Sequence, residues 1–158
     1  MNDYHMHSHF CRHAEGRVAD YARAARDRGI TEICVTPHIP LPGFRPGFSG
    51  DKLRMDETEF DSYLRELEEA RSAFPQLTIL SGVEADYIPE QEDWLARFLS
   101  RAAFDFVLMS IHFISVWGEE EWAFDFARHR PLPSAYHEYF QQMRQGHPDR
   151  PLRLRGAS

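Results

Sequence analysis

The stretch LTILSGV, from Leu77 to Val83, predicts a buried strand, because it is a short run rich in apolar and β-branched residues. It runs directly into Glu84, so a carboxylate follows the expected end of the strand. Upstream, the apolar spacing of residues 56–74 predicts a helix whose first turn is crowded with acidic residues. A strand that follows a helix in this way is typical of a parallel sheet.

The alternation of strands and helices extends in both directions from this stretch. The expected elements, in chain order, are a strand at 4–10, a helix at 16–29, a strand at 30–36, a helix at 56–74, a strand at 77–83, a helix opened by Pro89, a strand at 104–113 and a helix at 134–145. Loops are expected at 40–50 and 114–130. The order predicts an α/β fold with parallel strands and outer helices.

The chain is short for this architecture. Four strand–helix units make about half of a closed (β/α)8 barrel, which typically needs about 250 residues, and the chain has 158. We therefore expect the N-terminal portion of a barrel at residues 1–145. Residues 146–158 show almost no apolar periodicity and are expected to form an irregular tail, left by a truncation or an altered reading frame near Gln145.

The composition excludes several classes of protein. A hydrophobic content of 42% with 12 Phe, 6 Tyr and 3 Trp excludes disorder as the main state. The formal net charge of −7 argues against a nucleic-acid partner. No apolar run reaches the roughly 18–20 residues of a membrane span, and no signal peptide is evident. Only Cys11 and Cys34 are present, so we expect a reducing cytoplasm rather than a disulfide framework.

Side chains that bind metals fall at the C-terminal ends of the predicted strands. His5 and His7 alternate along the first strand, so both point to one face. His38 follows the second strand, Glu84 the third, and His112 lies at the end of the fourth. Ligands of parallel α/β sheets bind at this edge, so we expect the five residues to converge on a metal site. Imidazole and carboxylate donors suit Zn, Mn or Fe.

Four motifs resemble the PHP (polymerase and histidinol phosphatase) superfamily. They are DYHMHSHFCRHAEG at 3–16, TPH at 36–38, GVEADY at 82–87 and SIHF at 110–113. The first and third are similar to the histidinol-phosphatase branch rather than to the PHP domains of DNA polymerases. The resemblance covers about Asp3 to Gln145, and it implies a distorted (β/α)7, TIM-like barrel with a trinuclear metal centre at the strand ends.

The resemblance also implies roles for residues outside the predicted strands. The loop after the first strand would supply a further ligand, with Glu15 as the first choice and His13 as the second, whereas His9 is expected to be an ordinary loop residue. Arg12 is a candidate phosphate contact, although a solvated loop charge is an equal interpretation. His147 lies in a GHPD segment similar to one that carries a ligand in the family, but no predicted strand precedes it.

The activity implied by the resemblance is metal-dependent hydrolysis of a phosphomonoester. The implied substrate is L-histidinol phosphate, converted to L-histidinol and phosphate in histidine biosynthesis, with two or three divalent ions assisting the attack of hydroxide on phosphorus. The family's final D-x-H motif is missing from the chain. Two alternatives therefore stay open: an inactive remnant that binds metal, and a PHP-type nuclease or phosphoesterase. The oligomeric state is left open.

Overall fold

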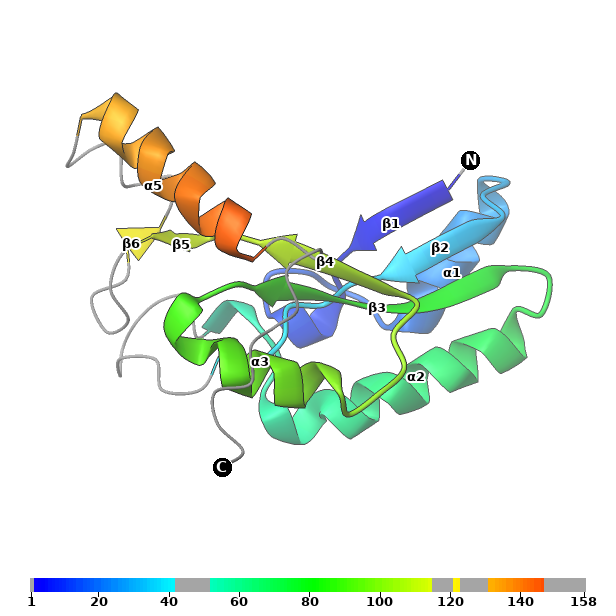
Figure 1. Ribbon diagram of the computed structural model, residues 1–158. Coiled ribbons are helices and arrows are strands. Elements are labelled where there is room, and N and C mark those ends of the chain that lie inside the picture. The colour runs from blue at the N-terminus through cyan, green and yellow to red at the C-terminus, as the bar shows by residue number, and fades with distance from the viewer. Residues whose placement is uncertain (1, 42–51, 115–120, 123–130, 147–158) are drawn as a thin grey trace. The chain divides into compact units, whose positions relative to one another are not determined.

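The computed structural model of the protein describes residues 2–41, 52–114, 121–122 and 131–146 (Figure 1). The chain divides into two compact units. The first consists of Met1–Glu84 and Phe104–Leu108, and the second of Ala85–Ala103 and Met109–Ser158. Among the helices that the structure describes, none is both long and apolar enough to cross a membrane.

The sheet has the strand order β1-β2-β3-β4, which is also the order along the chain. Its strands are β1 (Asn2–Met6), β2 (Glu32–Val35), β3 (Thr78–Asp86) and β4 (Phe106–Ser110). Strand β2 pairs in parallel with both neighbours, so that Ile33 lies opposite Asp3 on one side and Ile79 on the other. Consecutive strands that lie side by side are what successive β/α units produce. The α/β class with parallel strands is therefore confirmed.

Two helices of the first unit pack against each other, α1 (Val18–Asp27) and α2 (Phe60–Ala73). The start of α1 is capped by Asp20, whose carboxylate accepts a hydrogen bond from the Arg17 backbone N–H at 2.9 Å. A short 3-10 turn, η3 (Glu57–Glu59), precedes α2. Most of the apolar side chains that predicted both helices are buried, whereas Tyr21 and Leu64 are partly buried. The buried ones are Val18, Ala22, Ala25, Phe60, Tyr63, Leu67 and Phe74.

The side chain of Tyr63 connects α2 to the sheet through hydrogen bonds. Its ring is fully buried, and its hydroxyl oxygen lies 2.8 Å from the Val35 carbonyl oxygen of β2 and 2.5 Å from that of Gly82 in β3. The close approach at Gly82 depends on the missing side chain, because an added Cβ would lie 2.3 Å from Cys34 Sγ and 3.0 Å from the Phe106 carbonyl oxygen. The core of the first unit therefore has no room for a methyl group at this position.

Substitution Gly82→Ala is expected to destabilise the protein by about 1–3 kcal/mol, the usual range for an overpacked core. The double variant Gly82→Ala with Cys34→Ala should recover part of the loss, because the nearest clashing atom is the Cys34 sulfur. Urea unfolding of the wild type, both single variants and the double variant measures the coupling. Equal stability of Gly82→Ala and the wild type would contradict the packing described.

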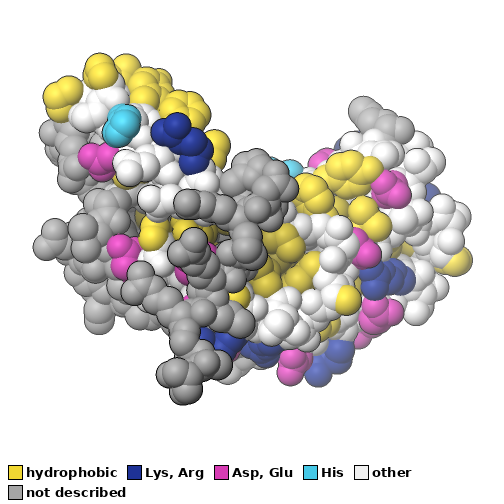
Figure 2. Space-filling view, viewed as in Figure 1, with side chains coloured by type: hydrophobic (Ala, Val, Ile, Leu, Met, Phe, Trp, Pro, Cys, Tyr) yellow, Lys and Arg dark blue, Asp and Glu magenta, His cyan; other side chains and the backbone are white. Residues whose placement is uncertain are grey.

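The described residues of the second unit form two helices, α3 (Glu92–Leu99) and α5 (Leu132–Gln145), and a small antiparallel pair of strands. The turn η4 (Pro89–Gln91) opens α3, as Pro89 predicts. The strand pair is β5 (Phe113–Ile114) and β6 (Glu121–Trp122). The end of α5 lies against Tyr87, whose carbonyl oxygen accepts a 2.7 Å hydrogen bond from the Gln142 side chain. Figure 2 shows apolar side chains at the surface of α5, and the exposed ones are Leu132, Tyr136, Phe140 and Met143.

Several predicted boundaries are corrected by the structure. The first strand ends at Met6 rather than Phe10, because the chain turns into the 3-10 helix η1 (His9–Cys11). The third strand runs on to Asp86, so Glu84 lies inside β3 rather than after it. The predicted strand at 104–113 ends at Ser110, and β5 begins at Phe113. Most of the two predicted loops, at 42–51, 115–120 and 123–130, and the tail at 147–158 lie outside the described residues.

Candidate metal centre

Backbone hydrogen bonds bring His38 and Glu84 side by side. The Ile39 N–H donates to the Glu84 carbonyl oxygen at 3.0 Å, and the Glu84 N–H donates to the Pro37 carbonyl oxygen at 3.0 Å. These two bonds form an isolated parallel bridge just beyond the end of β2. The structure therefore brings His38 and Glu84 together, although Glu84 lies within β3 rather than after it.

The Glu84 carboxylate is the centre of the cluster. Its side chain is only 2% exposed, and its Oε2 lies 3.0 Å from His5 Nε2 and 3.3 Å from His7 Nε2. The same oxygen lies 3.5 Å from His38 Nδ1. The ring of His5, in β1, also approaches the ring of His7, which directly follows β1. Their Nε2 atoms are 3.1 Å apart. One buried carboxylate thus faces three histidine rings.

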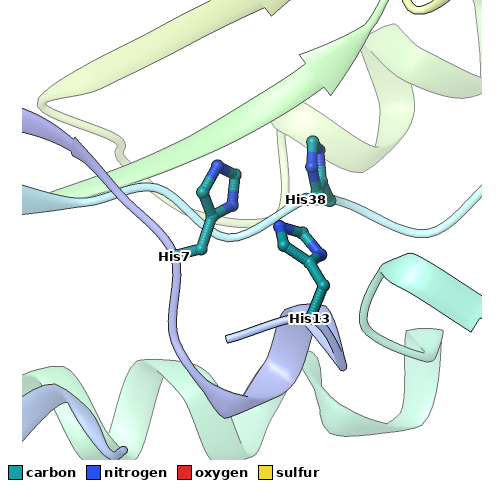
Figure 3. Close-up of side chains that lie close together, drawn as sticks. All are labelled: His7, His13 and His38. Carbon is teal, nitrogen blue, oxygen red and sulfur yellow. The ribbon is translucent and has the colours of Figure 1, made fainter. Parts of the chain in front are cut away.

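A second group shares two of these rings and adds His13 (Figure 3). His7 and His13 flank the turn η1, whereas His38 follows β2, and the three rings face a common space. The ring centroids are 4.8 Å apart for His7 and His13, and 4.6 Å apart for His7 and His38. One ring nitrogen of each residue lies within 4.8 Å of the others.

The spacing of these donors fits a metal ion. A tetrahedral zinc site with bonds of about 2.0–2.1 Å places neighbouring ligand atoms about 3.3 Å apart. The distances among His5 Nε2, His7 Nε2 and Glu84 Oε2 are 3.0, 3.1 and 3.3 Å. Lone pairs that face one another at this distance repel unless a proton or a cation lies between them. The residues present therefore fit a divalent metal held by imidazole and carboxylate.

Arg12 lies near the cluster but is already paired with two carboxylates. Its guanidinium contacts Glu59 at 2.5 Å and Asp56 at 3.1 Å. The hydrogen bond to Glu59 is the largest cause that raises the pKa of Arg12. The backbone of Arg12 has a φ of 60°, which lies in the left-handed region. Residues other than glycine rarely adopt this conformation. Here it turns the chain toward His13.

The other predicted residues of this loop lie apart from the donor groups. The Glu15 side chain is exposed and belongs to none of the metal-competent groups found among the described residues. His9 Nε2 lies 3.0 Å from the buried carboxylate of Glu66. Neither residue belongs to the groups of possible metal ligands among the described residues. His147 falls outside the residues that the structure describes.

His112 lies in the second unit, where Asp86 holds it. Asp86 Oδ1 is 2.8 Å from His112 Nδ1 and also accepts a 3.2 Å hydrogen bond from the His112 backbone N–H. The Asp86 side chain is only 1% exposed. A carboxylate that fixes one ring nitrogen directs the other toward a ligand. The sequence contained a signal for Asp86, since residues two apart on a strand point to the same face and Glu84 was already a candidate.

Like Asp86, Cys11 was not among the site residues predicted from the sequence. Its sulfur is fully buried and lies 3.3 Å from His7 Nδ1. It also accepts a 3.1 Å hydrogen bond from the His38 backbone N–H. Burial raises the pKa of Cys11 to about 11, which keeps the thiol neutral at physiological pH.

Comparison with known proteins agrees with this geometry. A family model described as the PHP domain matches residues 3–156 of the chain. The chain belongs to the PHP domain family. The family predicted from the four sequence motifs is confirmed.

Curated relatives of this PHP domain carry one name. A Deinococcus radiodurans protein named "Probable histidinol-phosphatase" is 30% identical over 141 residues, which are 87% of this chain and 52% of that protein. The Histidinol-phosphatase of Bacillus subtilis is 32% identical over 120 residues, 71% of this chain and 44% of the relative. The PHP domain described here thus spans about half the length of the curated relatives it matches.

Solved structures show the same fold. A Listeria monocytogenes protein described as a "putative histidinol phosphatase" superposes with a TM-score of 0.79, covering 98% of this chain and 63% of its own at 22% identity. At that identity the likeness shows the fold alone, which is the partial PHP-type barrel expected from the sequence. The histidinol phosphate phosphatase of Lactococcus lactis, solved with zinc, L-histidinol and phosphate, has a TM-score of 0.69 and 26% identity over 89% of this chain and 51% of that one.

Proposed function

We propose that this PHP domain takes part in metal-dependent hydrolysis of a phosphomonoester, with L-histidinol phosphate as the substrate and histidine biosynthesis as the setting. The observation that carries the proposal is the group of His5, His7 and Glu84, whose ligand atoms have the spacing of a coordination shell. The names of the relatives support the substrate, and one relative was solved with L-histidinol and phosphate.

The proposed ligands divide between the two units of the chain. In the first unit we assign His5, His7, His13, His38 and Glu84, and we favour His13 over Glu15 because its ring lies among the other donors. In the second unit we assign His112, oriented by Asp86. His147 stays a candidate from the sequence. Zinc is favoured over manganese or iron by the structure of the zinc-bound relative, with two or three ions as the proposed number.

The chain's own residues would hold the ions and orient the phosphate. A bound divalent ion polarises phosphoryl oxygens and supplies hydroxide at neutral pH. Glu84 and the histidines fix the position of such ions on strand ends and on loops tied to them. Arg12 is a proposed phosphate contact. Because it already pairs with Asp56 and Glu59, a phosphate must compete with those carboxylates for its guanidinium.

A second candidate function is metal binding without turnover. It needs only the donor groups that the structure shows, such as that of His5, His7 and Glu84. A nuclease is disfavoured by the net charge of −7. We place the protein in a reducing cytoplasm, since Cys11 and Cys34 are both buried and free of disulfides.

Phosphate release separates these functions. The purified chain, loaded with zinc or manganese, is assayed with L-histidinol phosphate and with single-stranded DNA, beside His7→Ala and a chelator-treated sample. We expect weak release from histidinol phosphate that falls to background in His7→Ala and with chelator. Metal binding without release would support the second candidate function. Cleavage of DNA, or release that survives the chelator, would contradict the proposal.

A further inference from the structure

Cys11 contacts three of the histidines that surround the proposed metal. Its Sγ lies 3.3 Å from His7 Nδ1 and accepts a 3.1 Å hydrogen bond from the His38 backbone N–H. Its carbonyl oxygen lies 2.8 Å from His13 Nδ1, and the Leu53 carbonyl oxygen lies 3.2 Å from the same nitrogen. A single residue of η1 therefore contacts the two histidines that flank this turn and the backbone at His38, the three residues labelled in Figure 3.

The contact of His13 with a carbonyl oxygen decides which of its ring nitrogens faces the other donors. A carbonyl oxygen only accepts hydrogen bonds, so His13 Nδ1 must carry the proton and its Nε2 is left with a lone pair. His7 Nδ1 faces sulfur, while its Nε2 faces Glu84 Oε2 at 3.3 Å and His5 Nε2 at 3.1 Å. A proton on Nδ1 of His7 likewise leaves Nε2 as the ligand atom.

We propose that Cys11 is a positioning residue that fixes the Nδ1–H tautomer of His7 and anchors the His38 segment, so that both histidines meet the metal in one arrangement. The inference rests on the proposed metal-dependent function, because it concerns how the ligands of that site are oriented. Cys11 is not assigned as a ligand: it belongs to none of the metal-competent groups among the described residues.

The local fold explains how a cysteine reaches both partners. The Cys11 N–H donates to the Ser8 carbonyl oxygen at 2.9 Å, which closes the 3-10 turn directly after His7. This turn places the Cys11 sulfur beside Nδ1 of His7, four residues earlier, and against the backbone N–H of His38. The other buried cysteine, Cys34, lies in β2 with its sulfur against Gly82, so it serves as a matched control.

The first test is zinc affinity, measured by competition with a chromophoric chelator on the full chain. We expect Cys11→Ala to weaken binding about 10–100-fold, the usual effect of losing a residue that orients a metal ligand. Cys11→Ser should lose less, because its hydroxyl oxygen still accepts a hydrogen bond from a ring N–H. Cys34→Ala leaves a similar cavity in the core and should stay within about 3-fold of the wild type.

The second test reads the tautomer of His7 directly. Long-range proton–nitrogen NMR spectra of the metal-free protein should show His7 as the Nδ1–H tautomer in the wild type and as a mixture in Cys11→Ala. If Cys11→Ala does not fold, Cys11→Val gives the same information, because it fills the space without offering a hydrogen-bond acceptor. In cobalt-loaded protein, a thiolate-to-cobalt charge-transfer band would show that Cys11 is a ligand and would overturn the proposal.

The outcomes separate this inference from the proposed function. If the wild type binds zinc but Cys11→Ala and Cys34→Ala bind it equally well, the positioning role is wrong and the metal site stands. If the wild type does not bind zinc, the proposed metal centre fails. An Nε2–H tautomer of His7 in the wild type overturns the inference whether or not metal binds.

Discussion

Substitution Glu84→Gln should lower zinc affinity more than about 100-fold, beyond the usual effect of changing a residue that only orients a ligand. In the part of the chain that the structure describes, Glu84 is the one carboxylate whose oxygen lies within 3.5 Å of His5, His7 and His38 together. Glutamine keeps its size but replaces an anionic ligand with a neutral amide. Competition with a chromophoric chelator measures the change in affinity, and unfolding in urea reports whether the variant is folded.

Glu66→Gln is the matched control for this prediction. Glu66 is also a buried carboxylate, and it pairs with His9 at 3.0 Å and with Arg17 at 2.9 Å rather than with the metal group. Its substitution should destabilise the protein, because two side chains lose a charged partner, while zinc affinity stays within about 10-fold of the wild type. Equal losses of zinc affinity in Glu84→Gln and Glu66→Gln would contradict the prediction. They would show that the affinity falls whenever a buried carboxylate is lost, and not because a metal ligand is lost.

Tyr63→Ala should destabilise the first unit by about 3–5 kcal/mol, the range for removing a large aromatic ring from a core. The ring is fully buried, and its hydroxyl also lies against backbone carbonyls of β2 and β3. Tyr63→Phe should lower the free energy of unfolding by about 1–3 kcal/mol, because it removes the hydroxyl and keeps the ring. The free energy of unfolding is measured in urea.

Tyr136 offers a control of the same residue type. Its side chain on α5 is 56% exposed, so Tyr136→Ala should change the stability by no more than about 0.5 kcal/mol. If the two alanine variants lose the same amount, the placement of Tyr63 between α2 and the sheet is wrong.

Much of the fold could be predicted because its signals are local and periodic. The apolar spacing of α2 and the β-branched run of β2 each decide an element without reference to the rest of the chain. Ends of elements were less certain. The first strand was extended to Phe10, since no local signal showed that the chain would turn after His7 into η1. The continuation of β3 through Asp86 depends on the backbone bridge to His38, a contact between distant segments.

The candidate site also contains residues that local signals predict and residues whose contacts depend on how the chain folds. His5, His7, His38 and Glu84 could be found because strand ends and alternation place them on one edge of the sheet. The sequence prediction put Glu15 before His13, and we now propose the reverse order, because the left-handed turn at Arg12 directs the chain so that His13 lies among the other donors. Cys11 was missed because its contacts with His7 and His38 arise only when η1 folds the chain back.

The most direct test of the metal centre is an anomalous-difference map collected at the zinc absorption edge from crystals of the zinc-loaded protein. The account predicts a peak about 2.0–2.2 Å from His7 Nε2 and from the carboxylate of Glu84, the usual bond lengths of zinc to nitrogen and oxygen. A map in which zinc binds elsewhere, with His5, His7 and Glu84 bearing no ion, would contradict it.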